Sequence, residues 1–157
     1  MHSNRYTLLF VFIITVVLGT LLSFTKENLK DKQENNLRAD VNKTILRSLD
    51  FVEEEENPWS NEKVEEIFNN SIMALCVDVE GNKIDTVVLE EIDIERDVKR
   101  LPVYLKVVEG ELQGIALPVA GKGLWSTLFG YIALGPDLDT VLGIQFYKHG
   151  ETPGLGG

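Results

Sequence analysis

The sequence predicts an α+β protein in which an N-terminal transmembrane helix is followed by a second helical segment and an antiparallel-sheet domain that is incomplete at its C-terminus. Three observations support this fold class: an uncharged apolar run near the N-terminus, a helical pattern without Gly or Pro after it, and apolar segments of strand length from residue 71 onward. We therefore divide the chain into an N-terminal flank, a transmembrane helix, a juxtamembrane helical segment with an acidic linker, and the first part of a sheet domain, at residues 1–5, 6–24, 25–70 and 71–157.

The apolar run from Tyr6 to Phe24 has nineteen residues without a charge and lies between Arg5 and Lys26. A helix needs about 20 apolar residues to cross the hydrocarbon core of a bilayer. A cleaved signal peptide is the alternative, but its apolar region would be shorter and would end at a small-residue cleavage site that this run does not contain. We interpret the run as an uncleaved membrane anchor.

Charge is unevenly distributed along the chain. Beyond position 25 there are fourteen Lys and Arg residues and twenty-five Asp and Glu residues, a net charge of −11. Such an excess argues against nucleic acid as a partner, because phosphate binding needs a basic surface. The two histidines and the single Cys76 have no spacing typical of a metal site, so we expect no metal, and we interpret Cys76 as a buried small apolar residue rather than a reactive thiol.

After the anchor, apolar residues recur at helical spacing in the stretch from Lys26 to Asp50, at Leu29, Leu37, Val41, Ile45 and Leu49. This pattern predicts an amphipathic helix that continues out of the membrane. The run Glu53-Glu54-Glu55-Glu56 then interrupts the pattern and is interpreted as a solvated linker, since cation binding would need further oxygen ligands at spaced positions. Ser60 is expected to cap a short helix whose apolar face contains Val64, Ile67 and Phe68.

Strand patterns follow. We expect a strand over 72–79, a hairpin over 102–117 with its turn at Glu109-Gly110, and a second hairpin over 128–147 with its turn at 135–139. The strands of the second hairpin are largely apolar, so we expect both of its faces to be covered. No structure is assigned to residues 84–100.

Two glycine-containing loops flank the second hairpin, at Gly121–Ser126 and at Gly150–Gly157. Glycine allows a backbone to approach another group closely, although such clusters are more often simple turns, and Trp125 in the first loop could be a core residue. If the intervening strands pair, both loops lie at one end of the sheet, where an indole, a hydroxyl and a carboxylate would suit a flat aromatic ligand. No pair of nucleophile and base is visible, so no catalytic residue is assigned.

The residues of these loops resemble those of one known family. Leu117-Pro118-x-x-Gly121-Lys122-Gly123-Leu124-Trp125-Ser126 and Gly150-Glu151-Thr152-Pro153-Gly154-Leu155-Gly156-Gly157 are similar to motifs of the C subunit of the Na+-translocating NADH:quinone reductase. The related flavin-carrying G subunit of the Rnf complex shares the second motif. The resemblance implies an FMN-binding domain, a role in electron transfer, other reductase subunits as partners, and a location in the bacterial inner membrane. It also implies a set of cofactor-binding residues: Trp125, Thr152 and Leu155 against the flavin ring, with Glu151, Gly154, Gly156 and Gly157 shaping the pocket.

The sequence departs from the family pattern in one respect. Members of the family attach FMN through a phosphoester to the last Thr of a Ser-Gly-Ala-Thr-x-Thr segment downstream of Gly157, and no such segment occurs here. We therefore expect no covalent attachment site in this chain and interpret it as the front part of a longer protein, since compact domains are usually closed by a terminal strand or helix.

Two arguments give opposite orientations of the chain in the membrane. Lys26, Lys30, Lys32 and Arg38 follow the apolar run and only Arg5 precedes it, which by charge counting alone places the C-terminal part in the cytoplasm. The family resemblance implies a periplasmic flavin domain, and we adopt that orientation. The alternative to an electron-transfer subunit is an anchored, non-catalytic module whose loops bind a partner protein.

Overall fold

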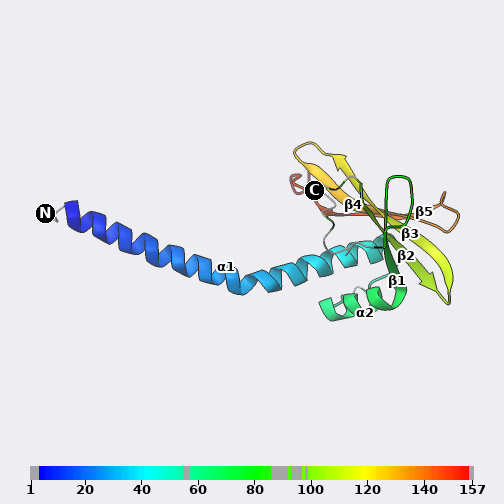
Figure 1. The fold of residues 1–157 in the computed structure, drawn as a ribbon, viewed down its shortest axis with the longest axis horizontal. Coiled ribbons are helices and arrows are strands. Elements are labelled where there is room, and N and C mark those ends of the chain that lie inside the picture. The colour runs from blue at the N-terminus through cyan, green and yellow to red at the C-terminus, as the bar shows by residue number, and fades with distance from the viewer. Residues whose placement is uncertain (1–3, 55–56, 86–91, 93–96, 98, 156–157) are drawn as a thin grey trace. The chain divides into compact units, whose positions relative to one another are not determined.

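The computed structural model of the chain describes all residues except 1–3, 55–56, 86–91, 93–96, 98 and 156–157. Its elements are α1 (Asn4–Ser48), α2 (Asn61–Ser71), β1 (Ile72–Val77), β2 (Leu101–Val108), β3 (Glu111–Lys122), β4 (Thr127–Leu134) and β5 (Val141–Lys148), shown in Figure 1. Met1–Arg38 and Ala39–Gly157 form two compact units, described here separately. The predicted α+β class, with a long apolar helix, a short helix and an antiparallel sheet, is confirmed.

The first unit contains most of α1, and its apolar side chains are exposed from Tyr6 to Phe24. By length and composition this helix could cross a membrane, a test that an N-terminal signal sequence also passes. Its threonines bond within the helix: Thr20 Oγ1 donates to the carbonyl of Val16 at 2.6 Å, and Thr25 Oγ1 donates to that of Leu21 at 2.8 Å. These hydroxyl groups therefore need no water, as an apolar environment requires.

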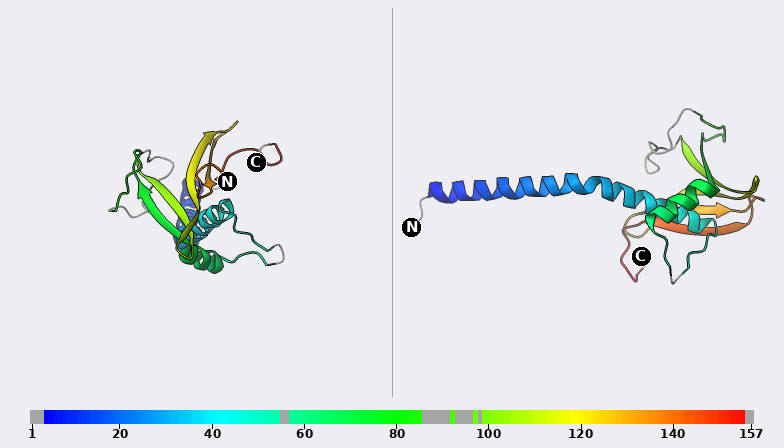
Figure 2. Two further views of the ribbon diagram at one scale, coloured as in Figure 1. Left: turned by 90° about the vertical axis from the view of Figure 1, so that its right-hand side faces the viewer. Right: turned by 90° about the horizontal axis from the view of Figure 1, so that it is seen from below.

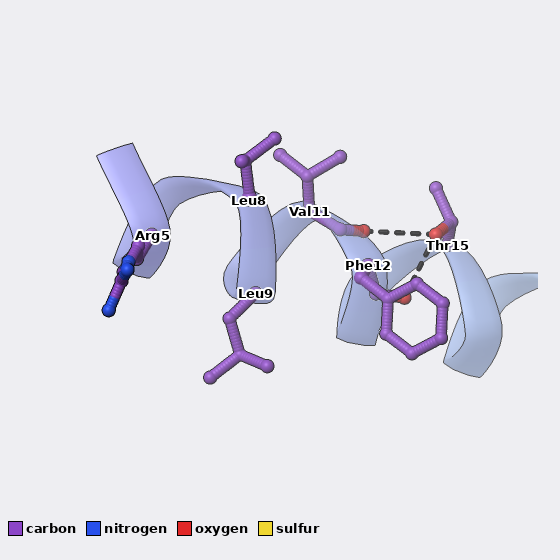
Figure 3. A pocket seen from close by; sticks show the side chains of 6 residues that line it. All are labelled: Arg5, Leu8, Leu9, Val11, Phe12 and Thr15. Carbon is purple, nitrogen blue, oxygen red and sulfur yellow. Dashed lines mark hydrogen bonds between the residues drawn. The ribbon is translucent and has the colours of Figure 1, made fainter. Parts of the chain in front are cut away.

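Figure 3 shows a shallow hollow on the surface of α1. Its walls are the side chains of Arg5, Leu8, Leu9, Val11, Phe12 and Thr15. The hydroxyl of Thr15 bonds back to the carbonyls of Val11 and Phe12 at 3.0 and 2.9 Å, so it does not face a ligand. The hollow is the space between side chains of one helix, and we assign it no function.

The core of the second unit forms where the end of α1 and the helix α2 pack on one face of the sheet (Figures 1 and 2). Its fully buried members are Ile45 from the end of α1, Leu49 directly after it, and Ala116, Tyr131 and Ala133 from β3 and β4. The predicted apolar stripe of the helix is thus confirmed from Val41 onward, whereas Leu29 and Leu37 are exposed.

Two contacts fasten the last turn of α1 to the sheet. Lys106 of β2 donates to the carbonyl of Leu49 at 2.9 Å, which satisfies one of the acceptors that a helix leaves open at its C-terminus. On β5, a Cβ added at Gly143 would lie 2.8 Å from the carbonyl oxygen of Ser48. Only glycine therefore allows β5 to approach the helix end this closely.

The loop after α1 corrects the interpretation of the acidic run as a solvated linker. The side chain of Glu53 is 11% exposed; it accepts a hydrogen bond from Lys43 at 2.6 Å and pairs with Arg47. The backbone N–H of Trp59 also donates to it, at 2.7 Å. The hydrogen bond from Lys43, with those from Arg47 and Trp59, lowers the pKa of Glu53 from 4.5 to about 2. Glu53 therefore anchors the loop, while Glu55 and Glu56 lie outside the described residues.

The helix α2 begins as predicted. Ser60 is its N-cap, and the Ser60 hydroxyl accepts a hydrogen bond from the backbone N–H of Lys63 at 3.3 Å. Val64 is buried, and Ile67 and Phe68 are half-buried on the same face. The ring of Phe68 meets that of Tyr104 edge to face, with centroids 5.9 Å apart, so α2 packs on β2.

The sheet is a meander of antiparallel strands in the order β1-β2-β3-β4-β5. Both predicted hairpins are confirmed, and the turn between β2 and β3 has positive φ at Glu109 (53°) and at Gly110 (85°), as a two-residue type I′ turn requires. The strand β1 ends at Val77 rather than at Val79. Most of the unassigned segment 84–100 lies outside the described residues; Ile92 within it is buried.

The strand β5 differs from expectation. It lies at one edge of the sheet, and its residues Val141, Ile144 and Phe146 are exposed. The described residues therefore cover only one face of this strand, although we expected both to be covered. The opposite side of the same strand faces the core. Leu142 and Tyr147 pack there, and the ring of Tyr147 stacks on that of Tyr131 with centroids 5.8 Å apart. An apolar composition therefore did not distinguish a strand covered on one face from one covered on two.

Candidate functional site

The first glycine-containing loop is a tight turn between β3 and β4. The strands pair as far as Lys122 opposite Thr127, so Gly121 and Lys122 belong to β3, although the sequence pattern placed them in the loop. The backbone N–H of Gly123 donates to the carbonyl of Ser126 at 2.8 Å. We call Gly123–Ser126 the tryptophan turn, because it presents Trp125 at its tip.

The C-terminal loop after β5 lies beside the tryptophan turn (Figure 1), as the hairpin argument predicts. One oxygen of Glu151, Oε1, accepts hydrogen bonds from the backbone N–H of Trp125 at 3.0 Å and of Ser126 at 3.1 Å. In the other direction, the backbone N–H of Gly150 donates to the hydroxyl of Ser126 at 2.6 Å. We call these three hydrogen bonds the loop bridge. The N–H of Trp125, followed by that of Ser126, holds the pKa of Glu151 below its ordinary value.

Two glycines lie where these loops approach each other. A Cβ at Gly123 would lie 2.4 Å from Glu151 Oε1 and 2.9 Å from the carbonyl oxygen of Ser126. At Gly150 it would lie 3.0 Å from the side chain of Ser126. The close approach of the two loops therefore depends on the absence of a side chain at Gly123, whereas a side chain at Gly150 would require a small shift of Ser126.

Apolar side chains at this end of the sheet point into solvent. Leu124 is 78% exposed, Trp125 is 72% exposed and Leu155 is 82% exposed. Trp125 is therefore not packed into the core of the described residues. Large exposed apolar side chains on two loops that hydrogen bonds join are typical of a binding surface rather than of a closed turn.

The remaining predicted residues of the C-terminal loop are exposed. Thr152 and Leu155 form a turn in which the N–H of Leu155 donates to the carbonyl of Thr152 at 3.0 Å, and Gly154 between them has a positive φ of 77°. Gly156 and Gly157 lie outside the described residues. The structure thus brings Gly150 and Glu151 to the tryptophan turn, and Thr152 to Leu155 follow them along the same loop.

Sequence reasoning missed two residues of this site. It assigned no role to Ser126, whose hydroxyl joins the loops, and it did not single out Leu124, which is as exposed as Trp125. No motif marks a serine as a bridge between loops, because its partner is a backbone N–H distant in sequence. An exposed indole, two exposed leucines and a glycine-lined backbone together fit a planar, largely apolar ligand edge such as an isoalloxazine ring.

Comparison with known proteins agrees with this geometry. Residues 123–157, which begin at the tryptophan turn, match the FMN-binding domain family. Over 99% of its length the chain is 33% identical to the C subunit of the Na(+)-translocating NADH-quinone reductase of Pseudomonas aeruginosa and 32% identical to that of Vibrio alginolyticus. A solved structure of this subunit from Parabacteroides distasonis superposes with a TM-score of 0.67 at 28% identity over 80% of the chain. The chain spans 67% of the length of those two relatives and 60% of the solved chain.

Proposed function

The chain belongs to the family of the C subunit of the Na+-translocating NADH-quinone reductase, and from this premise we propose that it carries FMN and transfers electrons within such a complex. The observation that carries the proposal is the convergence of the tryptophan turn with the loop 150–155 inside the segment that matches an FMN-binding domain. FMN bound there would supply reversible uptake and release of electrons. The chain's own residues bind and orient the cofactor.

We propose a role for each predicted site residue. Trp125 and Leu155 offer exposed apolar surfaces to the flavin ring, and the Thr152 hydroxyl lies on the same loop as Leu155. Glu151 and Gly154 shape the pocket, the first by fixing the tryptophan turn and the second by its positive φ. Gly156 and Gly157 lie outside the described residues, and we include them among the cofactor-binding residues only because they belong to the family motif. Covering the ring with these side chains would exclude water from one face of it.

We propose a location from the long apolar helix and from the family resemblance. We propose that residues 6–24 of α1 anchor the chain in lipid of a bacterial inner membrane and that the flavin domain is periplasmic. Supporting the anchor are nineteen uncharged residues and threonine hydroxyls that bond within the helix. The partners are other subunits of the reductase. No role is proposed for nucleic acid, since the part of the chain beyond position 25 is strongly acidic.

A second function is a membrane-anchored module that binds a partner protein through the same loops. The observation in its favour is the exposure of Leu124, Trp125 and Leu155, because apolar groups of this kind also serve protein interfaces. A flavin-carrying protein of the Rnf type would use the same loops as the leading proposal.

Titration of the full chain in detergent with free FMN separates the two functions. In a Trp59→Phe background Trp125 is the only tryptophan left, so stacking on the flavin should quench its fluorescence in a saturable way. A matched chain with Trp125→Phe and Trp59 retained reports quenching that does not involve the site. Loss of Trp125 fluorescence that never saturates would favour the partner-binding module.

Covalent attachment is tested separately. We expect no flavin fluorescence on a denaturing gel when this chain is produced with the flavin transferase of the family, because no Ser-Gly-Ala-Thr-x-Thr segment is present. A longer member of the family that contains the segment is the positive control. A fluorescent band from this chain would mean that another residue accepts the phosphate.

A further inference from the structure

The carboxylate of Glu151 is directed at the backbone of the tryptophan turn. Its Oε1 atom accepts from two consecutive N–H groups, at 3.0 and 3.1 Å. In the opposite direction, the hydroxyl of Ser126 in the turn accepts a hydrogen bond from the backbone N–H of Gly150 at 2.6 Å. Three backbone donors from two loops are thus satisfied by side chains of the opposite loop.

We propose that Glu151 is a positioning residue: through the loop bridge it fixes the tryptophan turn against the C-terminal loop, and it acts on the flavin only through the placement of Trp125. The part of the proposal that concerns the flavin rests on the proposed function. The part that concerns the loop bridge does not.

The exposure of Trp125 explains why such a bridge is needed. Because 72% of this residue is exposed, packing on the domain does little to fix its position. A hydrogen bond to an ionised carboxylate is stronger than one between neutral groups, so Glu151 can hold the turn where packing cannot. A turn fixed before the ligand arrives need not be ordered during binding, and this preorganisation raises affinity.

Gly123 provides a way to break the bridge without changing any charge. A Cβ there would lie 2.4 Å from Glu151 Oε1 and 2.9 Å from the carbonyl oxygen of Ser126, so Gly123→Ala must displace the carboxylate and strain the turn that it holds. Gly121 is the matched control, because it lies two residues earlier in β3 and a Cβ there meets no atom within 4 Å. Glu151→Ala removes the acceptor, and Glu151→Gln removes the charge but keeps an oxygen that can accept both bonds.

The first experiment needs no flavin. Residue-resolved amide hydrogen exchange of the full chain in detergent micelles measures protection of the Trp125 and Ser126 N–H groups. We expect exchange about tenfold faster in Glu151→Ala and in Gly123→Ala, a smaller change in Glu151→Gln, and no change in Gly121→Ala. Unchanged exchange in Glu151→Ala would overturn the loop bridge.

The second experiment is an FMN titration of the same variants, read from Trp125 fluorescence in the Trp59→Phe background. The dissociation constant should rise about tenfold in Glu151→Ala and Gly123→Ala and less than about threefold in Glu151→Gln and Gly121→Ala. If Glu151→Gln weakens binding as much as Glu151→Ala while Gly123→Ala does not, the carboxylate acts directly on the flavin and the proposal is wrong.

Two further outcomes separate the hypotheses. Faster exchange with an unchanged dissociation constant would make Glu151 merely structural, which also overturns the positioning role. If the parent chain binds no FMN, the proposed function and the flavin part of this proposal both fail, and the exchange data alone decide whether the loop bridge exists.

Discussion

Two loops of the domain are each held by one carboxylate, and the two are held in different ways. In the loop after α1, Glu53 is nearly buried and bonds to the cations Lys43 and Arg47. In the C-terminal loop, Glu151 bonds to the backbone N–H groups of Trp125 and Ser126. Both carboxyl groups have a lowered pKa, for these two different reasons.

We expect the first of these loops to contribute to the stability of the domain and the second to contribute to ligand binding. The Glu53 loop begins just after Leu49, which is buried in the core, and includes Phe51, which packs against it, so we expect loss of its anchor to loosen this packing. The Glu151 loop supports Trp125 and Leu155, which are exposed, so loss of its anchor uncovers little that was buried. We therefore expect loss of the Glu53 anchor to lower the stability of the domain and loss of the Glu151 anchor to weaken ligand binding.

The largest effect is expected at the core beneath the first loop. Leu49 is fully buried, and Leu49→Ala should lower the free energy of unfolding by about 2–5 kcal/mol, because it removes buried methyl groups and leaves a cavity. Urea denaturation followed by circular dichroism measures the change. Val52→Ala is the control, since Val52 lies three residues away and is exposed, and it should be nearly neutral.

A smaller loss is expected when the first anchor loses its charge. Glu53→Gln keeps the shape of the side chain but leaves Lys43 and Arg47 without their partner. Because Arg47 is about half exposed and its pair is screened by solvent, we expect a loss of roughly 1–2 kcal/mol. Glu54→Gln, at the exposed neighbour, should have no comparable effect, and equal losses in the two variants would contradict the assigned role of Glu53.

The same anchor predicts a dependence on pH. The pKa of Glu53 is about 2 in the folded domain and 4.5 ordinarily, so its stabilising contribution is complete above the ordinary value and is lost as the pH falls toward 2. The difference in unfolding free energy between the parent and Glu53→Gln should therefore be constant above about pH 5.5 and shrink steadily below it. A difference that grows in acid would have the wrong sign for this mechanism.

The smallest effect on stability is expected at the second loop. Trp125→Ala removes a side chain that is 72% exposed, so the free energy of unfolding should change by no more than about 0.5 kcal/mol. Flavin binding or the spectrum of bound flavin should change clearly, because the ring loses its aromatic neighbour. A stability loss of about 3–5 kcal/mol, as for truncation of a core tryptophan, would remove the contrast between the two loops.

Sequence alone predicted the features that depend on local spacing. The cap at Ser60, the turn at Glu109-Gly110 and the hairpin that brings Glu151 near Trp125 all follow from residues close together in the chain. The environment of Glu53 could not be predicted, because four consecutive glutamates look alike until the helix face that carries Lys43 is known.

The limits of prediction at the site have a similar cause. The motif identified Trp125 and Glu151 but not the direction of the carboxylate, which depends on backbone N–H groups that no sequence pattern reveals. The exposure of Ile144 and Phe146 was missed because an apolar strand can be covered on one face or on two.

The contact between Gly143 and the last turn of α1 has a mechanical consequence. With the Ser48 carbonyl resting on the backbone of β5, there is no compressible side chain between the helix end and the strand. Close-packed interiors transmit strain, so we expect a small displacement of this turn to displace the part of β5 around Gly143. The strand β5 ends at Lys148, two residues before Gly150, whose N–H donates a hydrogen bond to Ser126. A displacement of the end of α1 should therefore reach the loop bridge through β5.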